Sequence, residues 1–203
     1  PSISVFSPNN QDSLVIGNKR FITWQSSMGT GDSVVLSYSI NGGTSFTPID
    51  TVAASLKAFK WTVPNVLSSD CIVKVTGYEN SLVSGTGTLF SILPQTLRVT
   101  SQYQNETYTT TSRKYITWDY TGAIDTLTAE YSSDNGVSWS SISASVLASN
   151  QYYEWNPVPS VSSASCLVKL SNKARTTVNS SSSLFTIAPQ SITVTSPIDT
   201  DSF

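Results

Sequence analysis

Apolar and polar residues alternate along the chain in short segments. Cys71, Val73 and Val75 alternate with Ile72 and Lys74. The same alternation places on a shared face Ile22 with Trp24, Phe90 with Ile92, and Leu36 with Tyr38 and Ile40. A period of two is typical of half-buried antiparallel strands, and no segment sustains the period of 3.6 that a helix needs. The pattern therefore predicts an all-β protein.

The chain repeats itself with a period of 94 to 95 residues. The paired motifs are KRFITW at 19–24 with RKYITW at 113–118, CIVKV at 71–75 with CLVKL at 166–170, and LFSILPQ at 89–95 with LFTIAPQ at 184–190. A third copy begins at residue 191 and stops after 13 residues. A unit of this length is a domain, because solenoid repeats span about 20 to 50 residues.

These observations predict three segments: a first repeat at 1–95, a second at 96–190, and the first strand of a truncated third repeat at 191–203. About seven short strands per unit, separated by Gly, Pro and Asn turns, predict two tandem immunoglobulin-like antiparallel β-sandwiches. The Pro-Gln pairs at 94–95 and 189–190 leave almost no linker, so we expect neighbouring domains to touch or to be stiffly joined. The partial third copy indicates a piece of a longer array.

Composition narrows the function classes. Charged residues make up 12% of the chain, roughly half the usual share, and the net charge is -2. The chain has no basic patch for nucleic acid and no apolar run long enough to insert into a membrane. It has no histidine, which removes the Ser-His-Asp mechanism and most zinc sites. Abundant Ser and Thr with strand-favouring residues suit a secreted, extracellular or cell-surface protein, and no cofactor is expected.

The segment YSSDNGVSW at 131–139 fits the pattern S-x-D-x-G-x-[ST]-W, which resembles the Asp-box of sialidases. The matching segment of the first copy has Asn41 and Phe46 in place of Asp134 and Trp139. An Asp at the start of such a turn can accept backbone N–H bonds, and the closing aromatic ring can fold over the hairpin. We interpret the segment as a structural turn and predict that the chain is not an enzyme.

The two cysteines, Cys71 and Cys166, occupy equivalent strand positions and are predicted to be buried free thiols. Trp24, Trp61, Trp118 and Trp155 are expected in the cores. Two alternatives stay open for acidic residues: a pair of glutamates for glycoside cleavage, and calcium at Asp199 and Asp201. The glutamates are scattered along the sequence, and two aspartates are too few for the six to eight oxygens that calcium takes, so neither site is predicted.

Tyrosines near loops of the second copy are the candidate ligand contacts. Exposed aromatic rings can stack on sugar rings, and the candidates for such a contact are Tyr103, Tyr108, Tyr152 and Tyr153. The alternative is that they are ordinary amphipathic tyrosines of a domain surface. A row of coplanar exposed rings would favour a carbohydrate site.

The order SP…ITW…YS.DNG.SW…W.VP…C.VKV…FTI resembles a recurrent fibronectin-III-like module of secreted bacterial proteins, especially those of Bacteroidetes. It is also similar to the fungal Ser/Thr-rich, GPI-anchored cell-wall domain family. The resemblance implies modules without catalytic residues that accompany hydrolases, adhesins or very long surface proteins.

The leading functional prediction is therefore a non-catalytic structural or adhesion module, a rigid spacer in a large secreted or surface-anchored protein. The alternative is a carbohydrate-binding accessory module of a polysaccharide-degrading enzyme. The expected partners are neighbouring domains of the same polypeptide and, in the alternative, a polysaccharide or cell-surface glycan.

Overall fold

The computed structural model describes residues 1–192. The chain divides into two compact units: unit 1 consists of Pro1–Gln95 with Thr121–Ala123, and unit 2 consists of the remaining described residues. The predicted third copy lies outside the described residues apart from its first two positions. No helix within residues 1–192 is both long enough and apolar enough to cross a membrane.

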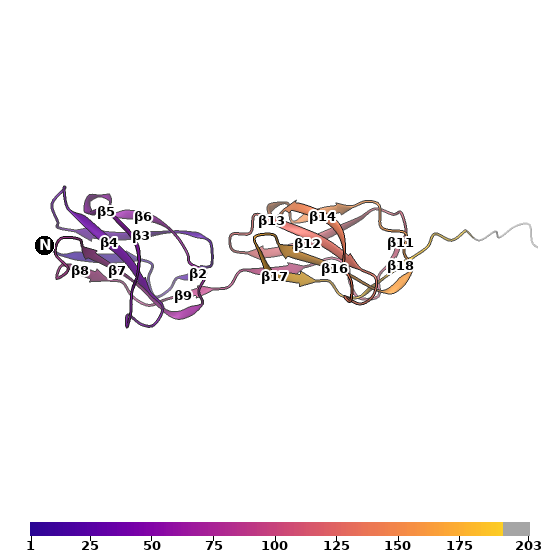
Figure 1. The fold of residues 1–203 in the computed structure, drawn as a ribbon, viewed down its shortest axis with the longest axis horizontal. Coiled ribbons are helices and arrows are strands. Elements are labelled where there is room, and N and C mark those ends of the chain that lie inside the picture. Colours follow the sequence, from indigo (N-terminus) through magenta and orange to yellow (C-terminus); the bar gives the residue numbers. More distant parts are fainter. Residues whose placement is uncertain (193–203) are drawn as a thin grey trace, which may run out of the picture. The chain divides into compact units, whose positions relative to one another are not determined.

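Unit 1 is built from nine short strands and one 3-10 helix (Figure 1). In chain order they are β1 (Ile3–Ser7), β2 (Ser13–Val15), β3 (Lys19–Ser26), β4 (Ser33–Ser39), β5 (Thr47–Ala53), η1 (Ala54–Leu56), β6 (Ala58–Thr62), β7 (Ser68–Gly77), β8 (Ser84–Thr86) and β9 (Phe90–Leu93).

Unit 2 repeats this order element by element. Its elements are β10 (Thr96–Val99), β11 (Thr107–Thr109), β12 (Lys114–Thr121), β13 (Thr126–Ser132), β14 (Ser140–Leu147), η2 (Ala148–Asn150), β15 (Tyr152–Trp155), β16 (Ser163–Asn172), β17 (Arg175–Ser181) and β18 (Phe185–Ala188).

Each unit packs a small sheet against a larger one. In unit 1 the small sheet has the order β1-β3-β6, and the larger sheet has the order β2-β9-β7-β4-β5 with β8 also paired to β7. Unit 2 has β10-β12-β15 and β11-β18-β16-β13-β14, with β17 paired to β16. Both units are immunoglobulin-like β-sandwiches, which confirms the predicted fold class.

The prediction of about seven strands differs from the nine in each unit because two strands are interrupted. The first strand begins in the small sheet as β1, where it pairs with β3, and continues in the larger sheet as β2 beside β9. The last strand is broken into β8 and β9, both paired to β7. Counted as continuous strands, each unit has seven.

The alternation of the sequence sets the two faces of each sheet. Cys71, Val73 and Val75 on β7 are fully buried, and on β3 Ile22 and Trp24 are 0% and 2% exposed. The buried residues of both sheets form one apolar cluster in each unit. All four tryptophans predicted for the cores, Trp24, Trp61, Trp118 and Trp155, are at most 4% exposed.

An aromatic trio bridges the two sheets of each unit. In unit 1 the Trp61 ring on β6 lies 5.6 Å from Tyr38 on β4 and 6.4 Å, edge to face, from Phe90 on β9. Tyr131, Trp155 and Phe185 repeat the arrangement in unit 2, at 5.6 and 6.4 Å. Such contacts between rings are worth about 0.5 to 1.5 kcal/mol beyond the area they bury.

The expectation that Ile40 shares a face with Leu36 and Tyr38 is wrong. Ile40 follows the end of β4 and is 42% exposed, whereas the preceding Ser39 is 2% exposed. Ser39 is turned inward because its hydroxyl is used by the next turn, where it donates to Asn41 Oδ1 at 2.8 Å and accepts from Gly43 N at 2.9 Å. A local polar bond therefore ends the alternation.

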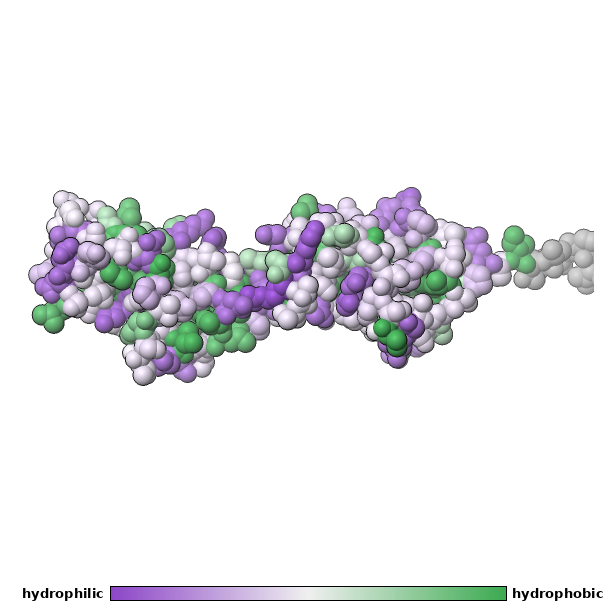
Figure 2. Space-filling model, in the orientation of Figure 1, coloured by the Kyte–Doolittle hydropathy of each residue, from purple (hydrophilic) through white to green (hydrophobic). Residues whose placement is uncertain are grey.

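The surface has few strongly hydrophilic residues. Figure 2 shows most of the visible face in pale tones of intermediate hydropathy, with hydrophobic and hydrophilic residues interspersed. The exposed apolar side chains include Phe21 and Leu67, which are 54% and 62% exposed. Because apolar atoms normally contribute over half of a folded surface, single exposed residues of this kind carry no functional signal.

The opposite faces of β3 provide a test of this core. Ile22→Ala should lower the free energy of unfolding by about 2 to 5 kcal/mol, because it leaves a cavity in a fully buried position. The neighbouring Phe21→Ala, at a position 54% exposed, should change it by about 0.5 kcal/mol or less. Urea unfolding followed by tryptophan fluorescence measures both, and equal losses would contradict the assigned faces.

Candidate carbohydrate-binding surface

The four candidate tyrosines do not share one surface of unit 2. Tyr152 on β15 is 56% exposed and Tyr103, in the loop before β11, is 67% exposed. Tyr153 is half-buried and packs against the core, on the opposite face of β15 from Tyr152. Tyr108 is only 4% exposed. Two of the four rings therefore face solvent.

The expectation for Tyr108 as a ligand contact needs correction. On β11 the flanking Thr107 and Thr109 point outward and Tyr108 points into the core, where its ring lies 5.0 Å from Phe185. Lys114 Nζ covers the ring at 4.3 Å, and the hydroxyl donates to Glu106 at 3.1 Å. Burial, together with the nearby Glu106 carboxylate, raises the pKa of the Tyr108 hydroxyl. Its ring is used in packing.

The structure instead brings Tyr152 next to Tyr115, and Tyr115 is a residue that the sequence analysis did not identify. Tyr115 lies on the outer face of β12 and is 48% exposed. Its ring centroid is 6.1 Å from that of Tyr152, with 64° between the planes. The alternation of the sequence could have identified Tyr115. It matches Phe21 of the first copy, and Phe21 is expected to face outward because the next residue, Ile22, faces the core. The pair is not coplanar, so a flat ligand can stack on one ring at a time.

Glu154 and the side chains bonded to it are the polar neighbours of this tyrosine pair. Its carboxylate forms an ion pair with Arg113 at 3.1 Å and accepts from the Tyr115 hydroxyl at 3.5 Å and from Asn156 at 3.3 Å. These side chains are well exposed, so the ion pair contributes little to stability. Chemically the surface offers two rings, an amide and a compensated charge, which is a small amphipathic patch.

The Asp134 turn has the structural role predicted for it. Asp134 Oδ1 accepts from Ser138 N at 2.9 Å and from the Ser132 hydroxyl at 2.7 Å, and Oδ2 accepts from the Ser138 hydroxyl at 2.5 Å. The hydrogen bonds from Ser138 and then Ser132 lower the pKa of Asp134 to about 2. Both carboxylate oxygens are engaged within the hairpin itself.

Asn41 performs the same task in unit 1 with one bond reversed. Asn41 Oδ1 accepts from Ser45 N at 3.0 Å and from the Ser39 hydroxyl at 2.8 Å. Its Nδ2 donates to the Ser45 hydroxyl at 2.9 Å, where in unit 2 the serine donates to the carboxylate. The turn therefore needs an acceptor and one adjustable partner, and a charge is not required.

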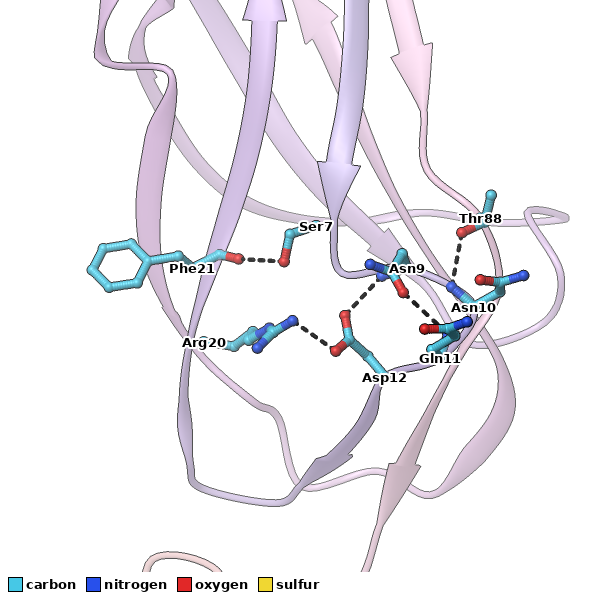
Figure 3. A network of polar contacts seen from close by, with 8 residues as sticks. All are labelled: Ser7, Asn9, Asn10, Gln11, Asp12, Arg20, Phe21 and Thr88. Carbon is cyan, nitrogen blue, oxygen red and sulfur yellow. Dashed lines mark hydrogen bonds and ion pairs between the residues drawn. The ribbon is translucent and has the colours of Figure 1, made fainter.

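A pair of carboxylates, one in each unit, caps the crossover between the two halves of the first strand. In unit 1 Asp12 accepts from Asn9 N at 2.9 Å and from Arg20 at 2.6 Å, and Asn10 N donates to Thr88 at 2.9 Å (Figure 3). These bonds join the crossover loop to Arg20 on β3 and to Thr88, between β8 and β9, which fixes the loop.

In unit 2 the matching carboxylate is Glu106. It accepts from Tyr103 N at 3.1 Å, as Asp12 does from Asn9 N. The same oxygen accepts from the Tyr108 hydroxyl, so Glu106 links the loop to the core. Both acidic groups stabilise the crossover between β-sheets in their own unit.

The remaining reactive side chains are also accounted for by structure. Cys71 and Cys166 are buried free thiols, as predicted, and burial raises the pKa of each. Thiol groups with a raised pKa are poor nucleophiles. Within residues 1–192 no cluster of three or more Asp, Glu or Cys side chains could hold a metal ion. The calcium alternative at Asp199 and Asp201 lies outside the described residues.

The depressed pKa of Asp134 gives the turn a pH dependence with a defined sign. Because the folded-state pKa of about 2 lies below the ordinary value of 3.8, the ionised carboxylate stabilises the hairpin above pH 3.8 and this contribution is lost as the pH falls toward 2. Asp134→Asn, which copies Asn41, should keep the fold and remove this dependence.

The measurement is the Tm of wild type and Asp134→Asn between pH 5 and pH 2, with Asp134→Ala as the variant that loses the turn at every pH. The Tm of wild type relative to that of Asp134→Asn should fall as the carboxylate is protonated. A constant difference in Tm across this range would contradict the bonding pattern.

Comparison with known proteins supplies similar folds and no family. No family model and no curated protein matches the sequence. Among solved structures, fibronectin(III)-like modules of CbhA from Clostridium thermocellum are 13% identical, with 92% of this chain and 94% of that chain covered and a TM-score of 0.30. A chimeric titin Z1Z2 is 15% identical, with 94% and 98% covered and a TM-score of 0.43.

The I9-I11 tandem of titin is 9% identical, with 92% of this chain and 66% of that chain covered and a TM-score of 0.45. These similar structures are tandem immunoglobulin-like and fibronectin-III-like domains. At such identities and TM-scores they indicate nothing of function, and the fold of this chain rests on its own strand order.

Proposed function

We propose that this chain is a non-catalytic spacer that transmits tension within a larger extracellular or cell-surface protein. One observation supports the proposal above the others: in each unit the first and last strands are paired in parallel. In unit 1 β2 pairs with β9, with Leu14 opposite Ile92, and in unit 2 β11 pairs with β18, with Tyr108 opposite Ile187.

Backbone bonds hold each of these pairs at both ends. Ser91 N donates to Asp12 O and Ile16 N donates to Leu93 O, both at 3.1 Å. In unit 2 the corresponding bonds are Thr186 N to Glu106 O at 2.8 Å and Thr110 N to Ala188 O at 2.9 Å. Hydrogen bonds across a parallel pair are evenly spaced along the strands.

This geometry determines how a unit meets a pulling force. The chain enters each unit at its first strand and leaves from its last, so tension draws two parallel strands in opposite directions along their length. Their hydrogen bonds are then loaded together in shear, whereas a hairpin pulled apart from its open end loses its bonds one at a time. A unit that resists extension in this way suits a spacer.

The surface composition is compatible with an extracellular place for such a spacer. Charged residues are 12% of the chain, and hydroxyl side chains are abundant. The cores of both units rest on packing with no disulfide, since both cysteines are free and buried. The expected partners in this role are neighbouring domains of the same polypeptide.

Single-molecule force spectroscopy on the whole chain, held at its two ends, tests the proposal. Thr110→Pro deletes the Thr110 N to Ala188 O bond, worth about 1 kcal/mol at equilibrium, and should lower the unfolding force of unit 2 alone. Thr110→Ala keeps the backbone N–H and is the matched control. If Thr110→Pro unfolds at the wild-type force, the parallel pair does not resist the applied tension and the proposal fails.

The Tyr115–Tyr152 pair favours a second candidate function, a carbohydrate-binding accessory module of a polysaccharide-degrading enzyme. Exposed rings beside Glu154 and Asn156 provide one stacking surface and several hydrogen-bonding groups. The 64° between the ring planes argues for a single sugar stacked on one ring, and a flat crystalline polysaccharide would need coplanar rings.

Titration with soluble polysaccharides, followed by tyrosine and tryptophan fluorescence, tests this candidate. The double variant Tyr115→Ala, Tyr152→Ala should weaken any saturable binding at least tenfold, about 1.4 kcal/mol. Tyr103→Ala, another exposed position of the unit, is the control and should leave the affinity unchanged. Binding that survives the double variant would remove the pair from the site.

A further inference from the structure

The outer face of the larger sheet of unit 2 is hollowed by a polar groove of about 470 Å³. The residues that line its floor and one side are Thr128, Glu130, Ser141, Ser143, Lys169 and Ser171. They come from β13, β14 and β16, on the sheet that does not carry Tyr115 and Tyr152. The groove is therefore independent of the tyrosine pair.

Strand register places the floor residues in two rows across the sheet. In the first row Glu130 on β13 lies opposite Lys169 on β16 and Ser141 on β14. In the second row Thr128 lies opposite Ser171. Neighbouring residues on one face of paired strands have Cβ atoms about 5 Å apart, so a ligand lying across the strands can contact several of them.

Strand β17, which pairs with β16 in the same sheet, completes the lining. Ser171 pairs with Asn179 on β17, and Asn179 and Thr176 both line the groove. Asn179 Nδ2 donates to Thr176 O at 2.9 Å, which holds the amide in place. The carbonyl oxygen of this amide is the group that a ligand can address.

The charges of the groove compensate each other. Lys169 Nζ lies 2.9 Å from Glu130 Oε2, and the two side chains are only 23% and 32% exposed. The ammonium group also lies 4.1 Å from the centroid of the Trp139 ring, so it is held on two sides. An ion pair fixed in this way presents oriented donors and acceptors without a net charge, which gives no preference for an anion or a cation.

We propose that this groove binds an uncharged saccharide. Six of its nine lining residues carry a hydroxyl or an amide group, and these groups donate and accept hydrogen bonds as sugar hydroxyls do. Glu130 can accept from, and Lys169 donate to, neighbouring hydroxyls of one sugar ring. A volume of about 470 Å³ falls in the range of small-molecule sites. This binding role goes beyond the spacer function and does not depend on it.

Unit 1 provides an internal contrast. At the positions of Thr128 and Glu130 it has Val35 and Ser37, opposite Thr76 and Lys74. The Ser37 hydroxyl donates to Lys74 O at 3.3 Å, so it is turned to the backbone. At these two positions unit 2 therefore has the threonine hydroxyl of Thr128 and the Glu130–Lys169 ion pair. Unit 1 has a valine and a serine whose hydroxyl is bonded to the backbone.

This contrast defines the variants. Thr128→Val, Glu130→Ser gives unit 2 the residues that unit 1 already tolerates at these positions. Thr128→Val alone removes one hydroxyl at nearly constant shape and leaves the ion pair intact. The variant Thr128→Val, Glu130→Ser also leaves Lys169 without its ion-pair partner. Comparison with Thr128→Val alone therefore separates the loss of ligand contacts from the change in charge.

The experiment is a titration of the full ¹⁵N-labelled chain with neutral tetrasaccharides of glucose, of xylose and of mannose, followed by amide chemical shifts. At least one should shift the amides of Glu130, Ser171 and Asn179 saturably. Thr128→Val, Glu130→Ser should weaken that response at least tenfold, and Thr128→Val alone should weaken it measurably. The variants' own spectra and Tm values show whether they remain folded.

Three outcomes would overturn the proposal. The first is no saturable shift at these amides with any of the sugars, and the second is a response that Thr128→Val, Glu130→Ser leaves unchanged. The third is a response that the groove variants leave in place and that Tyr115→Ala, Tyr152→Ala abolishes. The last would assign the ligand to the tyrosine pair. Failure here leaves the force experiment on Thr110 unaffected, so the two proposals can fail separately.

Discussion

The structure of each unit depends on the aromatic trio that joins its two sheets. Trp61 and Trp155 belong to the small sheets, and the rings they touch belong to the larger ones, so each trio spans the apolar layer. The alternating strands surround each trio with the other buried apolar side chains of the core. With the cysteines reduced, packing across this layer is the main source of stability in both units.

The buried layer explains why the acidic residues serve architecture. A sandwich requires a crossover between sheets and tight hairpins, and each leaves backbone N–H groups in need of acceptors. Asp134, Asn41, Asp12 and Glu106 supply those acceptors. The resemblance of one such turn to the Asp-box of sialidases reflects this shared requirement of turns.

Two copies of one architecture make it possible to separate what the fold requires from what each unit adds. The trio, the crossover cap, the hairpin acceptor and the parallel pair occur in both units. The outer faces differ: Tyr152 and Glu154 stand where unit 1 has Ala58 and Lys60, and Thr128 and Glu130 stand where it has Val35 and Ser37. A shared mechanical role and a ligand site on unit 2 fit this division.

The repeat, the all-β class and most of the buried strand faces could be predicted from the sequence, because these depend on the local period of two and on comparison of the copies. It also indicated that Cys71, Cys166 and the core tryptophans are buried. Three features could not be predicted and are seen in the folded chain alone: Tyr108 packs against Phe185, Tyr115 contacts Tyr152, and Thr128, Glu130 and Ser171 line one groove. Those facts depend on where the first strand changes sheets and on the register between strands distant in sequence, and neither leaves a local pattern.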